Sequence, residues 1–172
     1  TSLEQFYAAI NKVVPSLIRT EADELTYHFH VMIRYEIEKG LIDGSIQVKD
    51  IKQIWNDYYQ NYLGIHAQDD RDGVLQDIHW SHGSFGYFPT YSLGSLYAAQ
   101  FYTFAKQAIP DLEGNLELGH TKEFLIWLRT SIHAFGRRYT SDELCKLVTG
   151  SSLDTKYFFD YANKKYKEIY KF

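Results

Sequence analysis

One segment of the sequence gathers most of the side chains that could take part in chemistry. Residues 72–94 read DGVLQDIHWSHGSFGYFPTYSLG and combine two histidines three positions apart, a carboxylate just before them, and two tyrosines around a proline. Histidine and tyrosine can donate hydrogen bonds to an oxyanion that develops during a reaction. The candidate donors and their neighbours are Asp77, His79, Trp80, Tyr87 and Tyr91.

A further candidate lies upstream of this segment. Arg19 offers a planar guanidinium that matches the geometry of a carboxylate. No HExxH, CxxC, GxSxG or phosphate-binding loop accompanies these groups. The sequence therefore contains groups that could hold and polarise a substrate, but none of the common groups that attack one.

Each candidate also has a simpler structural interpretation. His79 could be a hydrogen-bonded structural histidine, and Arg19 an ordinary surface charge. His79 and His82 could bind a metal, but two ligands without a third make a poor site. Cys145 lies on the apolar side of a predicted helix, which indicates buried filler rather than a nucleophile. A hydrophobic anchor is the simplest role for Tyr87, Phe88, Tyr91 and Leu93.

The remaining sequence has the apolar spacing of helices, and no strand pattern competes. Capping boxes are predicted at Ser2 and Thr140, and a third at Thr20, with Gly40 as the C-cap of the helix that follows. Predicted helices lie before Pro15, over 20–39, from Ile51 to Gly64, from Leu93 to Ala108, and around 120–134, 141–149 and 155–171. We expect an all-α fold of about six or seven helices. Residues 64–88 lack this period, and so long a connection is typical of a functional loop.

Composition favours one soluble domain of 172 residues. The net charge of −4 and the lack of a basic cluster argue against nucleic acid as a partner. No apolar stretch is long enough to span a membrane. The single cysteine suits a reducing compartment, so we expect a cytoplasmic protein. Because the only methionine is Met32, we expect the chain to be processed or to be a piece of a longer protein.

Three motifs, in order, carry a family resemblance. Ile18–Asp23 fits IRxxAD, Gly73–Trp80 fits GxxQDxHW, and Gly86–Gly94 fits GYFPTYxLG. Together they resemble the carboxypeptidase Taq family of thermostable zinc metallocarboxypeptidases. The similarity runs from SLEQFY near the start to GRRYT near residue 140.

The resemblance implies a mainly helical fold related to other gluzincin peptidases, one zinc ion or another divalent metal such as cobalt, and removal of single residues from peptide C-termini. It also implies that the HExxH helix and the third zinc ligand lie upstream of the matched region. Residues 1–172 would then be a single unit from the C-terminal part of the catalytic domain and would hold no metal. We therefore expect the chain alone to be inactive without the upstream part of the enzyme. Family members are typically homodimers.

The resemblance also implies roles for the central segment. His79 and Tyr91, with Tyr87 as second choice, would donate hydrogen bonds to the oxyanion formed when zinc-bound water attacks the scissile carbonyl. His82 lies outside the recognised motifs and receives no role. Two other functions stay open, namely a catalytically inactive helical interaction module and a small metal protein that uses His79 and His82.

Substrate binding is assigned to three further residues. Arg19 would bind the free C-terminal carboxylate of the peptide, because a bidentate guanidinium recognises that group by geometry as well as charge. Asp77 would orient the loop or the His79 imidazole. Trp80 would pack beneath that imidazole.

Overall fold

The computed structural model describes all of residues 1–172 and is entirely helical, which confirms the all-α prediction. It contains eight α-helices, slightly more than the six or seven expected, and four short 3₁₀ segments. None of the helices combines the length and apolar character needed to cross a membrane. The helices are α1 Leu3–Ile10, α2 Tyr27–Asp43, α3 Ile51–Leu63, α4 Pro89–Ala108, α5 Leu112–Glu117, α6 Lys122–Ser131, α7 Ser141–Thr149 and α8 Lys156–Tyr170.

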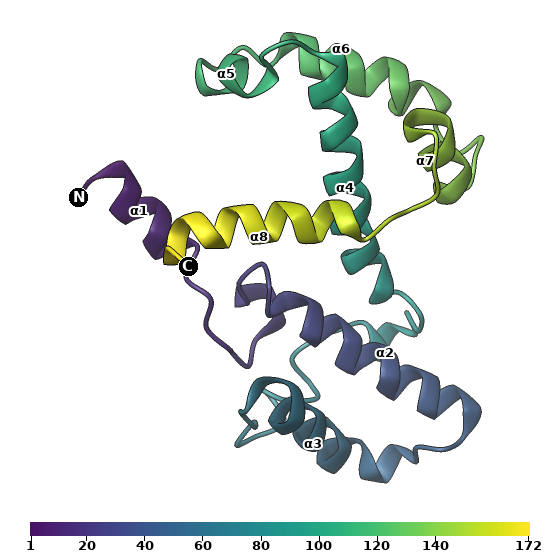
Figure 1. Ribbon diagram of the computed structural model, residues 1–172. Coiled ribbons are helices and arrows are strands. Elements are labelled where there is room, and N and C mark those ends of the chain that lie inside the picture. The colour runs from purple at the N-terminus through teal and green to yellow at the C-terminus, as the bar shows by residue number, and fades with distance from the viewer. The chain divides into compact units, whose positions relative to one another are not determined.

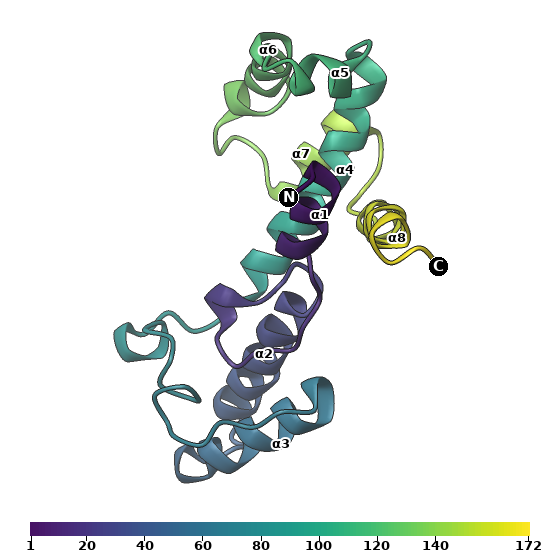
Figure 2. The same ribbon diagram turned by 90° about the vertical axis from the view of Figure 1, so that its left-hand side faces the viewer.

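The chain divides into two compact units, Thr1–Ser92 and Leu93–Phe172. In the first unit, α2 and α3 lie side by side, joined by a short connection (Figures 1 and 2). Their apolar stripes meet in a core of Ile33, Ile37, Trp55, Tyr59 and Leu63. Burial of each such aliphatic side chain contributes about 1.5–3 kcal/mol. As predicted, α3 ends at Gly64, whose φ of +72° favours glycine.

The predicted start of the helix over 20–39 is wrong, because the helix begins later in the structure. Arg19–Glu21 forms only a 3₁₀ turn, and α2 starts at Tyr27. The reason is the side chain of Asp23, whose Oδ1 accepts hydrogen bonds from the backbone N–H groups of Leu25 and Thr26 at 2.9 Å each. Asp23 therefore builds its own local turn and interrupts the helix that the sequence pattern suggests.

The predicted end of the same helix is also wrong. Gly40 does not cap α2 but lies buried within it, and the cap is Gly44, with φ of +81°. A Cβ on Gly40 would lie 2.6 Å from side-chain atoms of Ile46. Gly40 is thus a close-packing position, which a local sequence pattern cannot distinguish from a cap.

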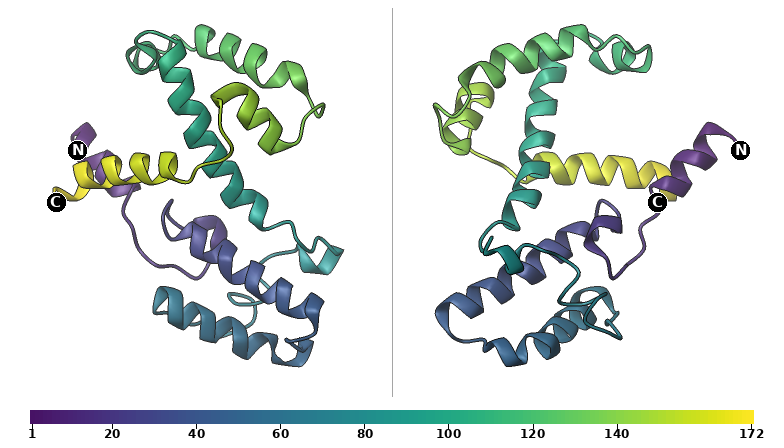
Figure 3. Two further views of the ribbon diagram at one scale, coloured as in Figure 1. Left: turned by 45° about the vertical axis from the view of Figure 1, so that its right-hand side comes forward. Right: turned by 180° about the vertical axis from the view of Figure 1, so that it is seen from behind.

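The second unit contains most of α4 together with α5 to α8. Ala105, Ile109 and Leu112 form its buried core. Figure 3 shows α7 beside α4, and the buried side chain of Gln100 joins them by donating to the hydroxyl of Thr149 at 3.0 Å.

Two predictions for α7 are confirmed. Thr140 and Glu143 form the capping box at its start, and Cys145 is fully buried. The unexpected helix is α5, which has only six residues and follows Asp111 in a left-handed conformation, with φ of +50°.

Candidate functional site

The long connection between α3 and α4 is irregular, as predicted, apart from a 3₁₀ turn at Trp80–His82. Gln76 fastens it to the segment before α2. Its side-chain amide donates to the carbonyl of Leu17 at 2.9 Å, and its side-chain oxygen accepts from the backbone N–H of Arg19 at 2.9 Å. One residue of the GxxQDxHW motif therefore brings the IRxxAD motif next to the loop.

Asp77 is shared between two arginines. Its Oδ1 lies 2.7 Å from Arg19 Nη2, and its Oδ2 lies 2.7 Å from Arg34 Nη2. Arg19 is 6% exposed and Arg34 is 0% exposed. Arg19 Nη1 also donates to the hydroxyl of Tyr27 at 3.0 Å. Buried charges need such partners, because an unpaired charge away from water is very costly.

Aromatic rings enclose these guanidiniums. The Arg19 guanidinium carbon lies 4.8 Å from the ring centroid of Tyr91, and that of Arg34 lies 4.5 Å from the ring of Trp55. Phe88, 1% exposed, is within 5.6 Å of both guanidinium carbons. Such stacking supplies cation–π stabilisation in a dry environment.

The two arginines change the acidity of Asp77. Burial alone would raise the pKa of Asp77, but the hydrogen bond from Arg19 and the charges of Arg34 and Arg19 lower it below its usual value. Burial opposes the charged form of Arg19 as well, yet Asp77 and Tyr27 raise the pKa of Arg19. Asp77 and Arg19 are therefore both charged near neutral pH.

His79 lies against the ring of Phe88, with centroids 4.4 Å apart, and its Nε2 is 3.0 Å from the hydroxyl of Tyr91. Its Nδ1 is buried and makes no hydrogen bond, since the nearest carboxylate oxygen, Asp77 Oδ1, is 3.9 Å away. Burial lowers the pKa of His79, although the charge of Asp77 opposes this. The imidazole is thus neutral near pH 7 and carries one N–H, either on Nε2 facing the Tyr91 hydroxyl or on the buried Nδ1.

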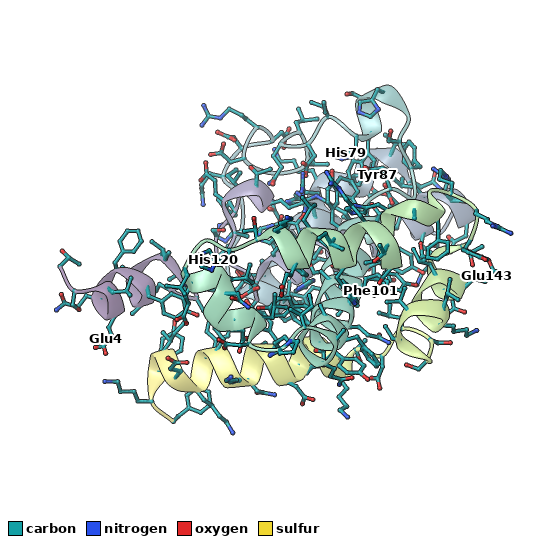
Figure 4. All side chains as sticks on the ribbon, turned by 90° about the horizontal axis from the view of Figure 1, so that it is seen from above. Glu4, His79, Tyr87, Phe101, His120 and Glu143 are labelled. Atoms are coloured by element: carbon teal, nitrogen blue, oxygen red, sulfur yellow. The ribbon has the colours of Figure 1, made fainter.

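Tyr87 is the most accessible of the candidate donors, with 49% of its surface exposed. Its ring lies 5.7 Å from that of His79 and 5.4 Å from that of Tyr91. Figure 4 shows Tyr87 next to His79. The structure therefore gathers His79, Tyr87 and Tyr91 into one cluster, with Arg19 and Asp77 directly behind it.

Trp80 packs on a different group from the one expected. Its ring stacks on Phe85 at 6.4 Å and meets Trp55 edge-on at 6.1 Å. Its indole Nε1 donates to Glu38 Oε1 at 2.8 Å, and the backbone N–H of Gly86 donates to Glu38 Oε2 at 3.0 Å.

Sequence reasoning missed the contribution of α2. His30, Arg34 and Glu38 occur every fourth residue, share one face of the helix, and are all buried. His30 Nδ1 lies 2.8 Å from the hydroxyl of Tyr59, which also accepts a hydrogen bond from Arg34 Nη1 at 3.1 Å. The sequence does show three polar residues at helical spacing beside the core residues of α2, but this spacing does not identify their partners.

The chain contains no group of three or more His, Cys, Asp or Glu side chains that could hold a metal ion. The rings of His79 and His82 are 6.0 Å apart, but His82 Nδ1 lies 2.9 Å from the hydroxyl of Ser84. These residues therefore do not fit a metal centre. What they offer is a cluster of uncharged donors beside a buried arginine pair.

Comparisons with known proteins identify the family of the chain. Residues 1–166 match the family model described as carboxypeptidase Taq (M32) metallopeptidase. The chain is 44% identical to carboxypeptidase 1 of Bacillus subtilis and 45% identical to thermostable carboxypeptidase 1 of Thermus thermophilus, covering 98% of this chain but only 34% and 33% of theirs. The crystal structure of the M32 carboxypeptidase from Deinococcus radiodurans R1 matches all of this chain and 35% of its own, with 39% identity and a TM-score of 0.95. The chain spans about a third of the length of these relatives, and it belongs to the carboxypeptidase Taq (M32) family of metallopeptidases.

Proposed function

We propose that the whole protein is a metal-dependent carboxypeptidase that removes single residues from peptide C-termini. The relatives named above are carboxypeptidases and about three times as long as this chain. In this proposal residues 1–172 belong to the C-terminal part of the catalytic domain, and they supply substrate recognition and transition-state stabilisation. The observation that carries it is the His79, Tyr87 and Tyr91 cluster beside two buried arginines.

His79, Tyr91 and Tyr87 act as donors to the oxyanion that forms as the scissile carbonyl becomes tetrahedral. A neutral imidazole and phenol hydroxyls suit this role because they donate without carrying charge into the site. The contact between His79 Nε2 and the Tyr91 hydroxyl fixes the two side chains relative to each other. Such preorganisation keeps the donors aligned before the negative charge develops.

Arg19 is the proposed recognition group for the free carboxylate of the substrate. Arg19, Arg34 and Asp77 together carry one net positive charge, which favours an anion nearby. Asp77 and Tyr27 hold the guanidinium in place, so its orientation is set before a substrate arrives. Trp80 and Asp77 support the loop that carries the donors.

The metal belongs to the rest of the protein in this proposal. We infer that zinc, or cobalt in its place, is bound by side chains outside residues 1–172, and none of the roles above passes through it. We further propose a cytoplasmic enzyme that forms a homodimer. The single buried cysteine is consistent with a reducing compartment.

The test uses the purified full-length protein and peptides in matched pairs, one with a free and one with an amidated C-terminus. Mass spectrometry should show stepwise loss of one residue from the free peptide only. A chelator should abolish the loss, and zinc should restore it. Cleavage at internal bonds, or equal cleavage of the amidated peptide, would contradict the proposal.

A further inference from the structure

Glu38 lies on the buried polar face of α2 and is 3% exposed. A polar side chain buried in this way needs hydrogen-bond partners. Its two oxygens accept from the Trp80 indole at 2.8 Å and from the backbone N–H of Gly86 at 3.0 Å. We call these two hydrogen bonds the Glu38 clamp.

The clamp brackets the turn that carries the proposed oxyanion donors. Trp80 directly follows His79, and Gly86 directly precedes Tyr87. One carboxylate therefore holds the side chain of the residue after His79 and the backbone of the residue before Tyr87. Gly86 has φ of +78°, a conformation that glycine adopts readily and other residues only with strain, so the orientation of this N–H depends on glycine at this position.

We propose that Glu38 is a positioning residue that sets the separation between His79 and Tyr87 by holding both ends of the intervening turn. Only the expected effect of Glu38 on kcat rests on the proposed function; the hydrogen bonds themselves do not. Because both clamp donors are N–H groups, the residue must present two acceptors. Glutamine has the same shape but replaces one oxygen with an NH₂ group, which would face one of the donors and leave it unpaired.

The test compares Glu38→Gln with Glu36→Gln in the full-length enzyme. Glu36 lies on the same helix and pairs with Lys39 at the surface, so it is a matched control. Glu38→Gln should lower kcat by about 10- to 100-fold, since a displacement of about 1 Å in a catalytic group has costs of this size, while KM and metal content stay near parent values. Glu36→Gln should leave kcat and KM unchanged.

Hydrogen exchange gives a readout that does not depend on activity. In Glu38→Gln the backbone N–H of Gly86 should exchange about tenfold faster than in the parent, because its hydrogen bond to the Glu38 side chain is lost. Unchanged exchange would show that no clamp exists. Faster exchange with unchanged kcat would show that the clamp does not position the donors. If the parent hydrolyses no peptide, the proposed function fails, and exchange alone decides the clamp.

Trp80→Phe keeps an aromatic ring against Phe85 and Trp55 and removes only one clamp donor. It therefore replaces Glu38→Gln as the test variant if Glu38→Gln does not fold. It should lower kcat by about threefold to tenfold. Combined with Glu38→Gln, it should add less than its separate effect, because both changes break the same hydrogen bond. Full additivity in the double variant would overturn the proposal.

Discussion

Asp77→Asn is the most informative single change to the buried network. It preserves the shape of the side chain and removes its charge, so that Arg19 and Arg34 lose their common counter-ion. One amide oxygen then remains to accept hydrogen bonds from two guanidiniums. The new NH₂ group must also face one of them, donor against donor.

The expected loss of stability follows from the burial of the three groups. Breaking a buried ion pair by removing one partner costs about 3–5 kcal/mol. Two arginines lose their partner at once, which favours the upper end of this range. The Asp77 side chain is 12% exposed and the amide oxygen still accepts one hydrogen bond, which favours the lower end. We therefore expect unfolding of the variant to require about 3 kcal/mol less.

Urea unfolding of the full-length protein, followed by tryptophan fluorescence, measures this difference. Trp55 lies 4.5 Å from the Arg34 guanidinium carbon and reports on the network directly. Asp142→Asn is the control, since Asp142 pairs with Lys146 on an exposed helix surface and its loss should leave the midpoint unchanged. Arg34→Met should cost less in the Asp77→Asn background than in the parent. A loss below about 1 kcal/mol for Asp77→Asn, or equal costs of Arg34→Met in both backgrounds, would refute the reasoning.

Four further predictions concern the same site. His79→Ala should lower kcat by about 100-fold or more, with KM nearly fixed and metal content unchanged. His82→Ala, at an exposed position, is the control and should leave kcat unchanged. Loss of metal from His79→Ala would contradict the assignment of His79 as an oxyanion donor. Arg19→Ala should raise KM at least as much as it lowers kcat, and it should weaken the preference for peptides with free over amidated C-termini. If this preference does not change, Arg19 has only a structural role. Burial, together with the charges of Arg34 and Arg19, lowers the pKa of His30 to about 4. As pH falls, His30 therefore binds a proton in the unfolded chain before it does so in the folded one, and the free energy of unfolding decreases by about 3 kcal/mol between pH 6.5 and pH 4. His30→Gln should abolish this decrease in urea midpoints measured across the same pH range. Residues 1–172 alone, with added zinc, should release no amino acids from peptides, because they hold no metal-binding cluster; zinc-dependent release would show a site elsewhere in the chain.

Local features of this protein could be predicted from sequence because their energetics lie within a few residues. The capping boxes at Ser2 and Thr140 and the glycine cap at Gly64 each involve partners no more than four positions away. The same range explains the correct prediction of an irregular segment between α3 and α4. The family motifs likewise singled out His79, Tyr87 and Tyr91, which lie close together in the sequence and also in the structure.

Features that depend on distant contacts needed the tertiary structure. Arg34 forms a hydrogen bond with Asp77, which lies 43 residues later in the sequence. Glu38 accepts hydrogen bonds from Trp80 and Gly86, which lie 42 and 48 residues later. Nothing local to α2 reveals whether a polar residue between apolar ones will find such partners. Gly40 shows the same limit, because its role depends on Ile46 folding back against it. The sequence by itself determined most of the helices and singled out the candidate donors, whereas only the packing of α2 against the long loop decided which charged side chains lie beside them. The free energy of a buried charge depends on partners that folding alone brings together.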